Sequence, residues 1–283
     1  MTENTIDGLI DATIQHLQKL KDEGVRYVPI SSARLQTAPA QSHISAQKVE
    51  QRASAAPIIA TPRIEDRIEA PRPTALGTAS KQQAMAELRE RALQCVKCPH
   101  LVSSRKNVVF GVGIVDAEIM FVGEAPGADE DVQGEPFVGK AGQLLTKIIQ
   151  TMGLDRDRVY IANILKCRPD TPGQSAGNRK PTPAEMQTCI PYLHAQIDVI
   201  QPKVLIALGA TAVEGLLGKV EGITRLRGNW KTYRNIPLMP TYHPAYLLRN
   251  QAMSEKRRVW EDMLQVMERV GMPITEKQRG YFL

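Results

Sequence analysis

The chain has 283 residues, 42% of them hydrophobic, which is enough for one large domain or two small ones with a sizeable core. No apolar run approaches the roughly 20 residues of a membrane span, and the first ten residues lack the basic start and apolar segment of a signal peptide, so we expect a cytoplasmic protein that does not enter a membrane. Residues 1–80 hold nine basic and nine acidic side chains, so the net charge of +6 belongs to residues 81–283. This excess of basic residues favours a polyanionic partner. The alternative is an ordinary solvated surface with a small excess of positive charge.

The first 80 residues are predicted to form a helix followed by a linker. Apolar side chains recur at helical spacing between residues 5 and 22 and Gly24 follows as a stop, so we predict an amphipathic helix over 1–24. It either binds a partner, folds back on the rest of the chain, or has no role. Residues 25–80 are rich in Pro, Ala and Gln with little apolar periodicity, which is typical of a disordered linker.

From residue 81 onward, strand-like runs alternate with helical patterns. The predicted strands are Val108–Phe110, Ile119–Val122, Val159–Asn163, Val204–Leu208 and Leu238–Thr241. The predicted helices are Lys81–Leu93, Ala141–Met152, Pro183–Ile200, Thr211–Leu217 and Glu255–Val270. This alternation predicts a three-layer α/β/α fold around a central, mainly parallel sheet. We assign the domain to residues 81–275 and a tail to 276–283.

The chain contains four cysteines, Cys95, Cys98, Cys167 and Cys189. In a reducing compartment, metal ligands or unrelated buried thiols are more common than disulfides. A structural zinc ion usually takes two close pairs, whereas a 4Fe-4S cluster accepts one close pair and two dispersed thiolates. The single C-x2-C pair therefore favours an iron-sulfur cluster over zinc and leaves four unrelated thiols as the alternative.

A glycine-hinged segment rich in carboxylates, with Glu124, Glu130 and Asp131, follows the predicted strand Ile119–Val122. Loops at the carboxyl ends of strands carry the chemistry of open α/β sheets, and carboxylates there orient water, hold a metal or stabilise a cation. Acids on a surface loop also serve solubility alone. The segment contains neither the G-x-G-x-x-G fingerprint nor a P-loop lysine, which argues against a nucleotide site of those kinds.

Asn163 and His243 end two of the predicted strands. An Asn side chain donates and accepts at once, as reading a base edge requires, but more often it caps a helix or a turn. A His at this place can stabilise an anionic leaving group, whereas a lone His beside a Pro is more often structural. Two basic loops, around Cys167 and around Trp230, suit contacts with phosphates.

Together these motifs closely resemble those of the family 4 uracil-DNA glycosylases, the iron-sulfur branch of the uracil-excising superfamily. The resemblance covers nearly all of residues 85–270, and its specificity comes from several motifs in the same order. They are Gly123–Gly127 with Glu130–Asp131, Pro136–Gly142, Asn163, Lys166–Pro169, Asn178–Arg179, Arg227–Gly228 and His243–Ala245.

The resemblance implies an enzyme of base excision repair that flips uridine out of DNA and hydrolyses its N-glycosidic bond, leaving an abasic site. Phe137 would stack on the uracil, Asn163 would read its pairing edge, and Gly123 and Ala125 would line the base. His243 would bond the uracil oxygen that gains negative charge.

The resemblance also implies roles for acidic, basic and sulfur-bearing side chains. Glu124, and with it Glu130, would order the attacking water or stabilise the sugar cation. The four cysteines would hold a 4Fe-4S cluster. The residues expected to contact DNA are Arg168, Arg179, Arg227, Leu247 and Arg249. Leu247 or its neighbour Leu248 would fill the gap in the duplex, and a core leucine at the start of a helix is the alternative.

Some positions depart from the family pattern or narrow the mechanism. Ala125 stands where a sister family has a water-orienting Asp, so the water-activating group stays open. No lysine is poised as a Schiff-base nucleophile, which predicts a monofunctional hydrolase, and no His lies between Lys166 and Pro191 to trap the abasic sugar. The alternative is a non-catalytic iron-sulfur module that binds DNA or senses redox state. We expect a monomer whose residues 1–24 bind a repair or replication protein.

Overall fold

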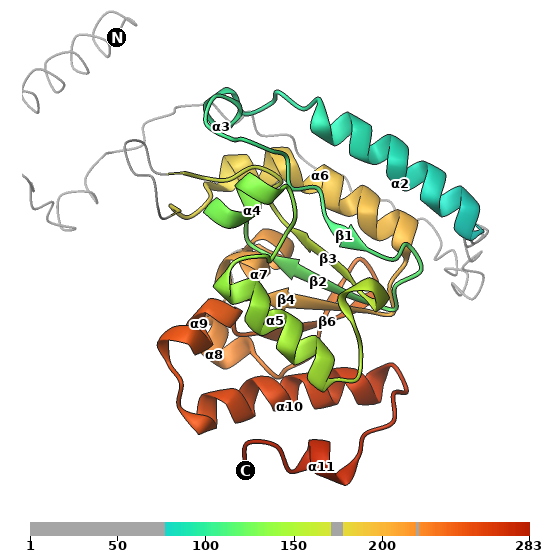
Figure 1. The fold of residues 1–283 in the computed structure, drawn as a ribbon, viewed down its shortest axis with the longest axis vertical. Helices are drawn as coiled ribbons and strands as arrows, with labels where there is room; N and C mark the ends of the chain where they lie inside the picture. The colour runs from blue at the N-terminus through green and yellow to red at the C-terminus, as the bar shows by residue number, and fades with distance from the viewer. Residues whose placement is uncertain (1–76, 171–177, 219–220) are drawn as a thin grey trace, which may run out of the picture. The chain divides into compact units, whose positions relative to one another are not determined.

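The computed structural model describes residues 77–170, 178–218 and 221–283 (Figure 1). The predicted helix over 1–24, its partner, and nearly all of the predicted linker lie outside these residues. The first described helix, α2, spans Thr78–Leu93 and so begins inside the range assigned to the linker. No helix in the described part of the chain is long and apolar enough to cross a membrane.

Six strands form one sheet in the order β1-β3-β2-β4-β6-β5. Their bounds are β1 Val112–Gly113, β2 Ile119–Gly123, β3 Tyr160–Asn163, β4 Val204–Leu208, β5 Lys231–Tyr233 and β6 Ile236–Thr241. The central strands β3, β2, β4 and β6 are mutually parallel, and the short edge strands β1 and β5 pair antiparallel. β2, β3 and β4 are buried along their whole length, as near-continuous apolar runs in a parallel sheet require.

Helices cover both faces of this sheet, which confirms the predicted α/β/α layers. On one face lie α2, α6 (Pro183–Ile200) and α7 (Ala210–Leu217), and on the other lie α5 (Lys140–Thr151) and α10 (Met253–Arg269) (Figure 1). Side chains of β2 alternate between the two cores: Met120 and Val122 join the first, and Ile119 and Phe121 join the second. The shorter helices are α3 Pro99–Val102, α4 Ala128–Gln133, η2 Arg156–Arg158, α8 Ile223–Leu226, α9 Pro244–Arg249 and α11 Glu276–Arg279.

The order of the strands places a topological switch beside β2. The chain passes from β2 to β3 on one side and then from β3 to β4 on the other side of β2. Ligands of open α/β sheets bind where such connections diverge, at the carboxyl ends of the strands. The same edge carries the ends of β2, β3, β4 and β6.

Two local predictions were wrong, and the segment assigned as a tail contains a short helix. Val108–Phe110 is not a strand: its residues are buried, but Val109 N–H pairs with the Lys166 carbonyl (2.8 Å) outside any ladder. The predicted acidic loop folds after Gly127 into α4, where acidic residues in the first turn suit the positive end of the helix. The C-terminal tail contains the helix α11 (Glu276–Arg279). Trp260 Nε1 donates to the carbonyl of Gln278 (2.6 Å), a residue of this helix.

Candidate active site and cysteine pocket

The parallel strands bring Gly123, Asn163 and His243 to one edge of the sheet. Gly123 and Asn163 are register partners at the ends of β2 and β3, and His243 follows β6. Gly209, which follows β4, has φ 90°, and a Cβ added to it would lie 2.9 Å from His243 Cβ. A glycine there lets His243 lie directly against the end of the neighbouring strand.

Gly123 is the point where two predicted substrate-binding side chains meet. A Cβ added to Gly123 would lie 2.3 Å from Asn163 Oδ1 and 2.5 Å from Phe137 Cζ. Any larger residue would therefore displace one of the two groups. The absence of a side chain at Gly123 is what allows the Asn163 amide and the Phe137 ring to face the same small space.

Phe137 is held in a strained conformation by neighbours from two other elements. Its φ of 56° is in the left-handed region that a bulky residue rarely adopts, and its side chain is buried. Arg156 donates to the carbonyls of Pro136 (2.8 Å) and Phe137 (3.1 Å). Glu130 Oε1 accepts from the N–H groups of Val138 and Gly139, both at 2.9 Å. The two charged side chains thus hold the backbone on both sides of the ring.

Asn163 carries a buried oxygen that no protein group satisfies. The residue is 2% exposed, and its Oδ1 is the one buried side-chain N or O atom without a hydrogen-bond partner among the described residues. Such an atom costs free energy, on the order of 1–3 kcal/mol, unless a ligand pairs with it. This marks Asn163 as a group held ready for a donor from outside the protein.

His243 faces the same space in its neutral form. Its ring lies 5.6 Å from the Phe137 ring, centroid to centroid, at 33°. Burial, with a smaller contribution from the positive charge of Arg249, lowers the pKa of His243 to about 4. Nδ1 accepts from Ala245 N–H (3.2 Å), so the proton of the neutral ring is on Nε2. His243 therefore offers one N–H donor for a ligand.

Glu124 follows β2 directly and lies in a partly desolvated place. Burial raises the pKa of its carboxyl group, and a hydrogen bond from Thr211 and the charge of Lys180 oppose that rise. Ala125, the next residue, packs against the core and has no polar side-chain atom. Of the described carboxylates of Glu124, Glu130 and Asp131, that of Glu124 is the one without a hydrogen bond from a backbone N–H group.

Glu130 and Asp131 are both committed to backbone N–H groups. Besides its bonds to the Phe137 turn, Glu130 accepts from Gly127 N–H (3.0 Å) through Oε2. Asp131 is buried and accepts from the N–H groups of Lys106 (2.9 Å) and Asn107 (3.3 Å). The two acids therefore position chain segments, and the sequence pattern alone did not distinguish them from Glu124.

The four cysteines, which are spread over residues 95–189, line one pocket together with Arg105 and Glu185. Arg105 Nη1 donates to Cys167 Sγ (3.1 Å) and Lys166 N–H donates to Cys189 Sγ (3.3 Å). Burial is the main cause that raises the pKa of Cys98 and Cys167, and it raises that of Cys189 to about 11. Within the described ranges, no three His, Cys, Asp or Glu side chains form a site for a metal ion. The four thiols thus line the same pocket.

Comparison with known proteins assigns the family. The family described as the Uracil DNA glycosylase superfamily matches residues 110–264. A type-4 uracil-DNA glycosylase of Thermotoga maritima is 45% identical over 189 residues, 65% of this chain and 93% of the relative. The chain belongs to the type-4 uracil-DNA glycosylases. A second type-4 relative, from Sulfurisphaera tokodaii, is 41% identical over 211 residues, 71% of this chain and 90% of the relative.

The wider superfamily is represented at greater distance. A type-5 uracil-DNA glycosylase of Pyrobaculum aerophilum is 28% identical over 190 residues, 56% of this chain and 80% of the relative. The type-4 relatives are closer, and the type-4 name is compatible with an iron-sulfur cluster. The resemblance inferred from the motifs is thereby confirmed at the level of the family.

Two of the predicted DNA contacts of this type-4 glycosylase are used inside the protein. Arg227 forms an ion pair with Asp262, which is fully buried and also accepts from Thr241 Oγ1 (2.6 Å). Leu247 is 6% exposed within a small core, whereas Leu248 is 39% exposed. The Arg227 charge is thus paired with Asp262, and the turn of α9 directs Leu247 inward, as the alternative of a core leucine requires. Leu248 is the leucine available to a DNA duplex.

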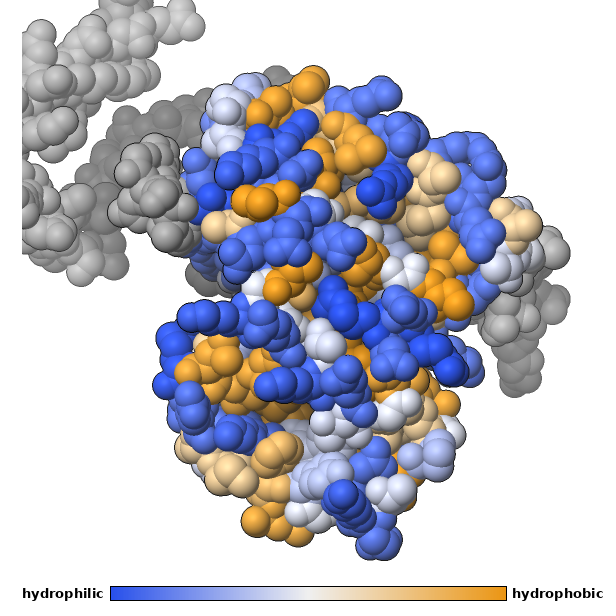
Figure 2. All heavy atoms as spheres, in the orientation of Figure 1, coloured by the Kyte–Doolittle hydropathy of each residue, from blue (hydrophilic) through white to orange (hydrophobic). Residues whose placement is uncertain are grey.

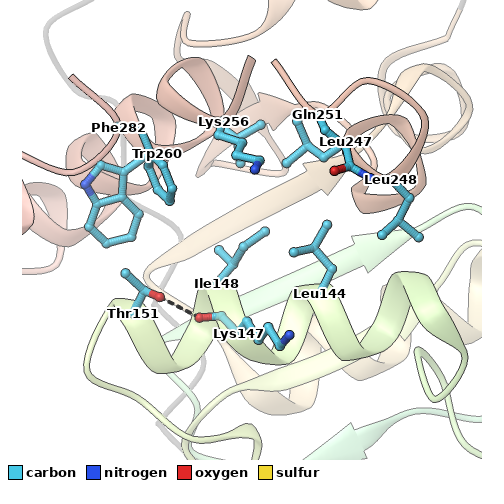
Figure 3. Close-up of a pocket in the computed structure, with 11 residues that line it drawn as sticks. Leu144, Lys147, Ile148, Thr151, Leu247, Leu248, Gln251, Lys256, Trp260 and Phe282 are labelled. Carbon is cyan, nitrogen blue, oxygen red and sulfur yellow. Dashed lines mark hydrogen bonds between the residues drawn. The ribbon is translucent and has the colours of Figure 1, made fainter. Parts of the chain in front are cut away.

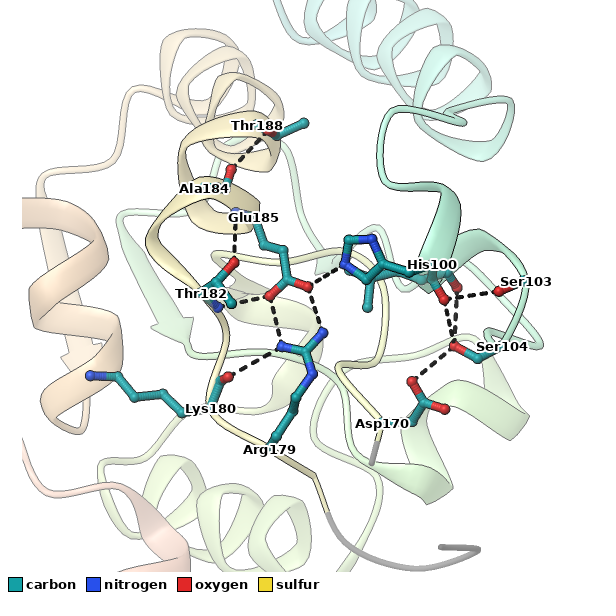
Figure 4. Close-up of polar contacts among 11 residues, drawn as sticks. His100, Ser103, Ser104, Asp170, Arg179, Lys180, Thr182, Ala184, Glu185 and Thr188 are labelled. Carbon is teal, nitrogen blue, oxygen red and sulfur yellow. Dashed lines mark hydrogen bonds and ion pairs between the residues drawn. The ribbon is translucent and has the colours of Figure 1, made fainter. Parts of the chain in front are cut away.

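Arg179 is also engaged, with Glu185, a residue that lines the cysteine pocket (Figure 4). Its guanidinium donates to both oxygens of Glu185, at 2.5 and 2.9 Å, and Glu185 further bonds His100 (2.6 Å) and Thr182 N–H (2.7 Å). Arg168 donates to Asn178 Oδ1 (2.9 Å), while Arg249 is exposed at the end of α9. Of the predicted arginines, Arg249 is the one whose exposed position at the pocket side suits a phosphate.

A separate apolar hollow lies beside Leu248 (Figure 3). It is lined by Leu144, Lys147, Ile148, Thr151, Leu247, Leu248, Gln251, Lys256, Val259, Trp260 and Phe282. Hydrophobic residues gather in this region between α5 and α10, with hydrophilic residues around them (Figure 2). None of the described side chains that line it is a His, Cys, Asp or Glu, and its polar side chains are those of Lys147, Thr151, Gln251 and Lys256.

Sequence reasoning missed three residues of the type-4 site: Arg156, Thr211 and Lys166. Arg156 holds the Phe137 turn, Thr211 bonds Glu124, and Lys166 bonds the Asn163 carbonyl (3.0 Å). The sequence did mark Lys166, because it lies in the motif Lys166–Pro169, but the prediction for it was a basic loop residue near phosphates. For Arg156 and Thr211 no local pattern distinguished them from ordinary helix residues.

Proposed function

We propose that the pocket formed by Gly123, Phe137, Asn163 and His243 binds a uracil flipped out of DNA and that the chain hydrolyses its N-glycosidic bond. The observation that carries this proposal is the buried, unpaired Oδ1 of Asn163. Uracil presents an N3–H donor and an O4 acceptor on its pairing edge, which an Asn amide matches with its oxygen and its NH2 group. Cytosine lacks the N3 proton and carries an amino group at C4, so it leaves the same amide mismatched.

The Phe137 ring provides the stacking surface for the base. Its left-handed backbone, fixed by Arg156 and Glu130, holds the ring against Gly123 before any ligand arrives. Base-aromatic stacking contributes about 1–3 kcal/mol. A ring fixed in advance loses little conformational entropy when the base enters, so more of that energy is retained in binding.

His243 stabilises the leaving group. As the glycosidic bond breaks, negative charge develops on the uracil. The Nε2–H of the neutral His243 imidazole then donates a hydrogen bond to the uracil O2 atom. A preorganised donor of this kind accounts for roughly 10²- to 10³-fold in rate in other enzymes.

Glu124 acts on the sugar side. Bond cleavage leaves an oxocarbenium-like sugar, which a nearby carboxylate stabilises while it orients the attacking water. The hydrogen bond from Thr211 and the charge of Lys180 oppose the desolvation that raises the pKa of Glu124. Glu130 contributes indirectly, by holding the backbone of the Phe137 turn. Ala125 lines the base without a polar group, so the water role belongs to Glu124.

The cysteine pocket fits a 4Fe-4S cluster held by Cys95, Cys98, Cys167 and Cys189. Four thiols surround the pocket, and N–H groups of Arg105 and Lys166 already donate to two of the sulfurs, as cluster thiolates require. When bound, the cluster would supply cross-links between the segment before β1 and the loop after Asn163. No step of the hydrolysis needs a change in its oxidation state.

The wider partners also belong to this proposal. Arg249 and Leu248, on α9 next to His243, are placed to contact a phosphate and to fill the vacated stack. The docking of a repair or replication protein by residues 1–24, and the monomeric state, stay predictions. The product of the reaction is an abasic site with an intact backbone.

The test is uracil release from a labelled oligonucleotide with one uracil, incubated with the full-length protein and then with alkali. We expect a break at the uracil alone, and none in the same oligonucleotide with cytosine or thymine. Asn163→Ala should lower the rate about 100-fold, whereas Asn229→Ala, which changes an exposed amide at the end of α8, should not. Intact wild-type reactions over a range of salt concentrations would refute the proposal and leave the non-catalytic module.

A further inference from the structure

Lys166 is a buried lysine whose ammonium group the proposed mechanism does not use. The residue is 1% exposed. Its Nζ donates to the Asn163 carbonyl (3.0 Å) and to Gln196 Oε1 (2.7 Å), and it lies 5.9 Å from the centroid of the Phe110 ring. No Asp or Glu among the described residues forms an ion pair with it.

A buried ammonium without a carboxylate is expensive. Removing a charge from water costs several kcal/mol, and apolar residues of similar size usually fill such places at lower cost. The methylene groups of Lys166 alone would be replaced without loss by those of Met. What a Met cannot supply is the donor pair to Asn163 and Gln196, so these two bonds are the distinctive property of Lys166.

Gln196 is fixed so that its oxygen points at Lys166. The residue is fully buried, and its Nε2 donates to the Phe110 carbonyl (2.9 Å) and to Tyr160 Oη (3.0 Å). Both donors of the amide are thus used, and Oε1 is left for the ammonium group. The network therefore has one orientation, in which every polar atom of Gln196 has a partner.

The backbone of Lys166 faces the other way, toward the cysteine pocket. Its N–H donates to Cys189 Sγ (3.3 Å), its carbonyl accepts from Val109 N–H (2.8 Å), and Cys167 is the next residue. A single residue thus contacts the strand end that carries Asn163 and two of the cysteines. Asn163, at the end of β3, has its carbonyl outside the strand ladder on that side, so the ammonium is the group that satisfies it.

We propose that Lys166, held by Gln196, is a positioning residue that fixes the Asn163 backbone to the cysteine side, so that the Asn163 amide stays aimed at the base. This inference rests on the proposed function of the pocket. Lys166 does not touch the substrate: it acts through Asn163. A shift of about 1 Å in a positioned group costs roughly 100-fold in rate, so loss of the two bonds is expected to be felt in catalysis.

The test is a double-mutant cycle in single-turnover excision of uracil by the full-length, cluster-loaded protein. Lys166→Met should lower the rate about 100-fold, change the DNA concentration for half-maximal rate by less than about twofold, and reduce the preference for uracil over cytosine. In an Asn163→Ala background the same substitution should change the rate less than about twofold. A residue with a general structural role would lower the rate in both backgrounds.

Three further measurements keep the outcome decisive. Lys203→Met, at an exposed lysine paired with Glu118, is the matched control and should leave rate and preference unchanged. Gln196→Leu removes the acceptor of the Lys166 ammonium group but keeps the ammonium charge. It should lower the rate about tenfold in the wild-type background and less than about twofold in the Asn163→Ala background. This variant tests the proposal if Lys166→Met does not fold. The visible absorbance band of the cluster should persist in both variants.

Two results would overturn the proposal. One is an unchanged rate and base preference in Lys166→Met while wild-type protein excises uracil. The other is loss of the visible band together with an equal loss of rate in the Asn163→Ala background, which would assign Lys166 to holding the cysteines. Wild-type protein that releases no uracil would instead refute the proposed function, so the two failures are distinguishable.

Discussion

The base pocket and the cysteine pocket lie at opposite ends of the short segment from Asn163 to Cys167 and satisfy their polar groups in opposite ways. In the base pocket, Asn163 Oδ1 has no partner and His243 keeps a free N–H. Beside the cysteines, the carboxylate of Glu185 bonds Arg179, Thr182 and His100 (Figure 4). The first region leaves interactions for a ligand, and the second completes them within the protein.

The difference teaches where stability and function are stored. An unpaired buried oxygen and a left-handed phenylalanine both cost stability, and they persist because the surrounding fold holds them in place. A carboxylate with several donors adds stability and has little left to offer a substrate. Substitutions in the base pocket are therefore expected to change rate more than stability, and those around Glu185 the reverse.

The largest effect is expected from His243→Ala. Loss of the donor to the leaving group should lower the single-turnover rate of uracil excision about 10²- to 10³-fold, while the melting temperature changes little. His194→Ala is the control, because His194 bonds Tyr233 (2.5 Å) away from the pocket. Full activity of His243→Ala would show that the base pocket works without this donor and would break the comparison.

Acid unfolding is expected to separate the two regions by pH. The pKa of His243 is lowered from 6.5 to about 4, so between these values the unfolded chain binds a proton that the folded protein does not, and stability falls as the pH falls from 6.5 to 4. Arg179 is the main cause that lowers the pKa of Glu185 from 4.5 to about 2, so its contribution is present above pH 4.5 and is lost as the pH falls to 2.

The measurement is the free energy of unfolding against pH, where each group contributes a slope of at most about 1.4 kcal/mol per pH unit. His243→Gln should flatten the upper window and Glu185→Gln the lower one. If both variants give curves parallel to that of the wild type, the two environments do not differ as the structure indicates.

A smaller effect on stability is expected from Glu185→Gln at neutral pH. The change weakens the bonds to Arg179 and His100. It should lower the free energy of unfolding by about 2 kcal/mol, because Glu185 is buried whereas Arg179 and His100 are partly exposed. Glu118→Gln, at an exposed pair with Lys203, should cost less than about 0.5 kcal/mol. A large loss of excision rate without loss of stability would contradict the assignment of Glu185 to structure.

The smallest effect is expected on DNA affinity. Arg249→Gln should remove one phosphate contact and reduce the slope of log K against log salt by about 0.9. Arg179→Gln should change the slope less, because Glu185 already neutralises that guanidinium. The slopes are measured by fluorescence anisotropy over a salt series. Equal changes in slope for the two variants would indicate that Arg179, beside the cysteine pocket, contacts DNA as Arg249 does.

Much of the fold and of the site was predictable from local patterns. The apolar runs at β2, β3, β4 and β6 were found within about two residues at each end, because a buried parallel strand must be apolar along its length. Asn163 and His243 were predicted as site residues because they follow parallel strands, whose carboxyl ends lie at the same edge of the sheet. The motifs then predicted the family, and the comparisons confirmed it.

Local patterns did not reveal the contacts of residues whose partners are distant in the chain. Arg227 was expected on DNA, yet it neutralises Asp262, 35 residues away. Val108–Phe110 has the composition of a strand, but its hydrogen bond goes to Lys166. Composition reports how apolar or charged a segment is, and it does not report which group will stand opposite.

The amino-acid sequence by itself determined the strands, their polar ends and the spacing of the cysteines, since these depend on side chains close together in the chain. Tertiary structure alone decided that Phe137 is left-handed, that Glu130 is committed to backbone N–H groups while Glu124 is not, and that the Lys166 ammonium supports Asn163. The physical reason is that a buried polar or charged group takes its role from the partner that satisfies it, and packing brings that partner from elsewhere in the chain.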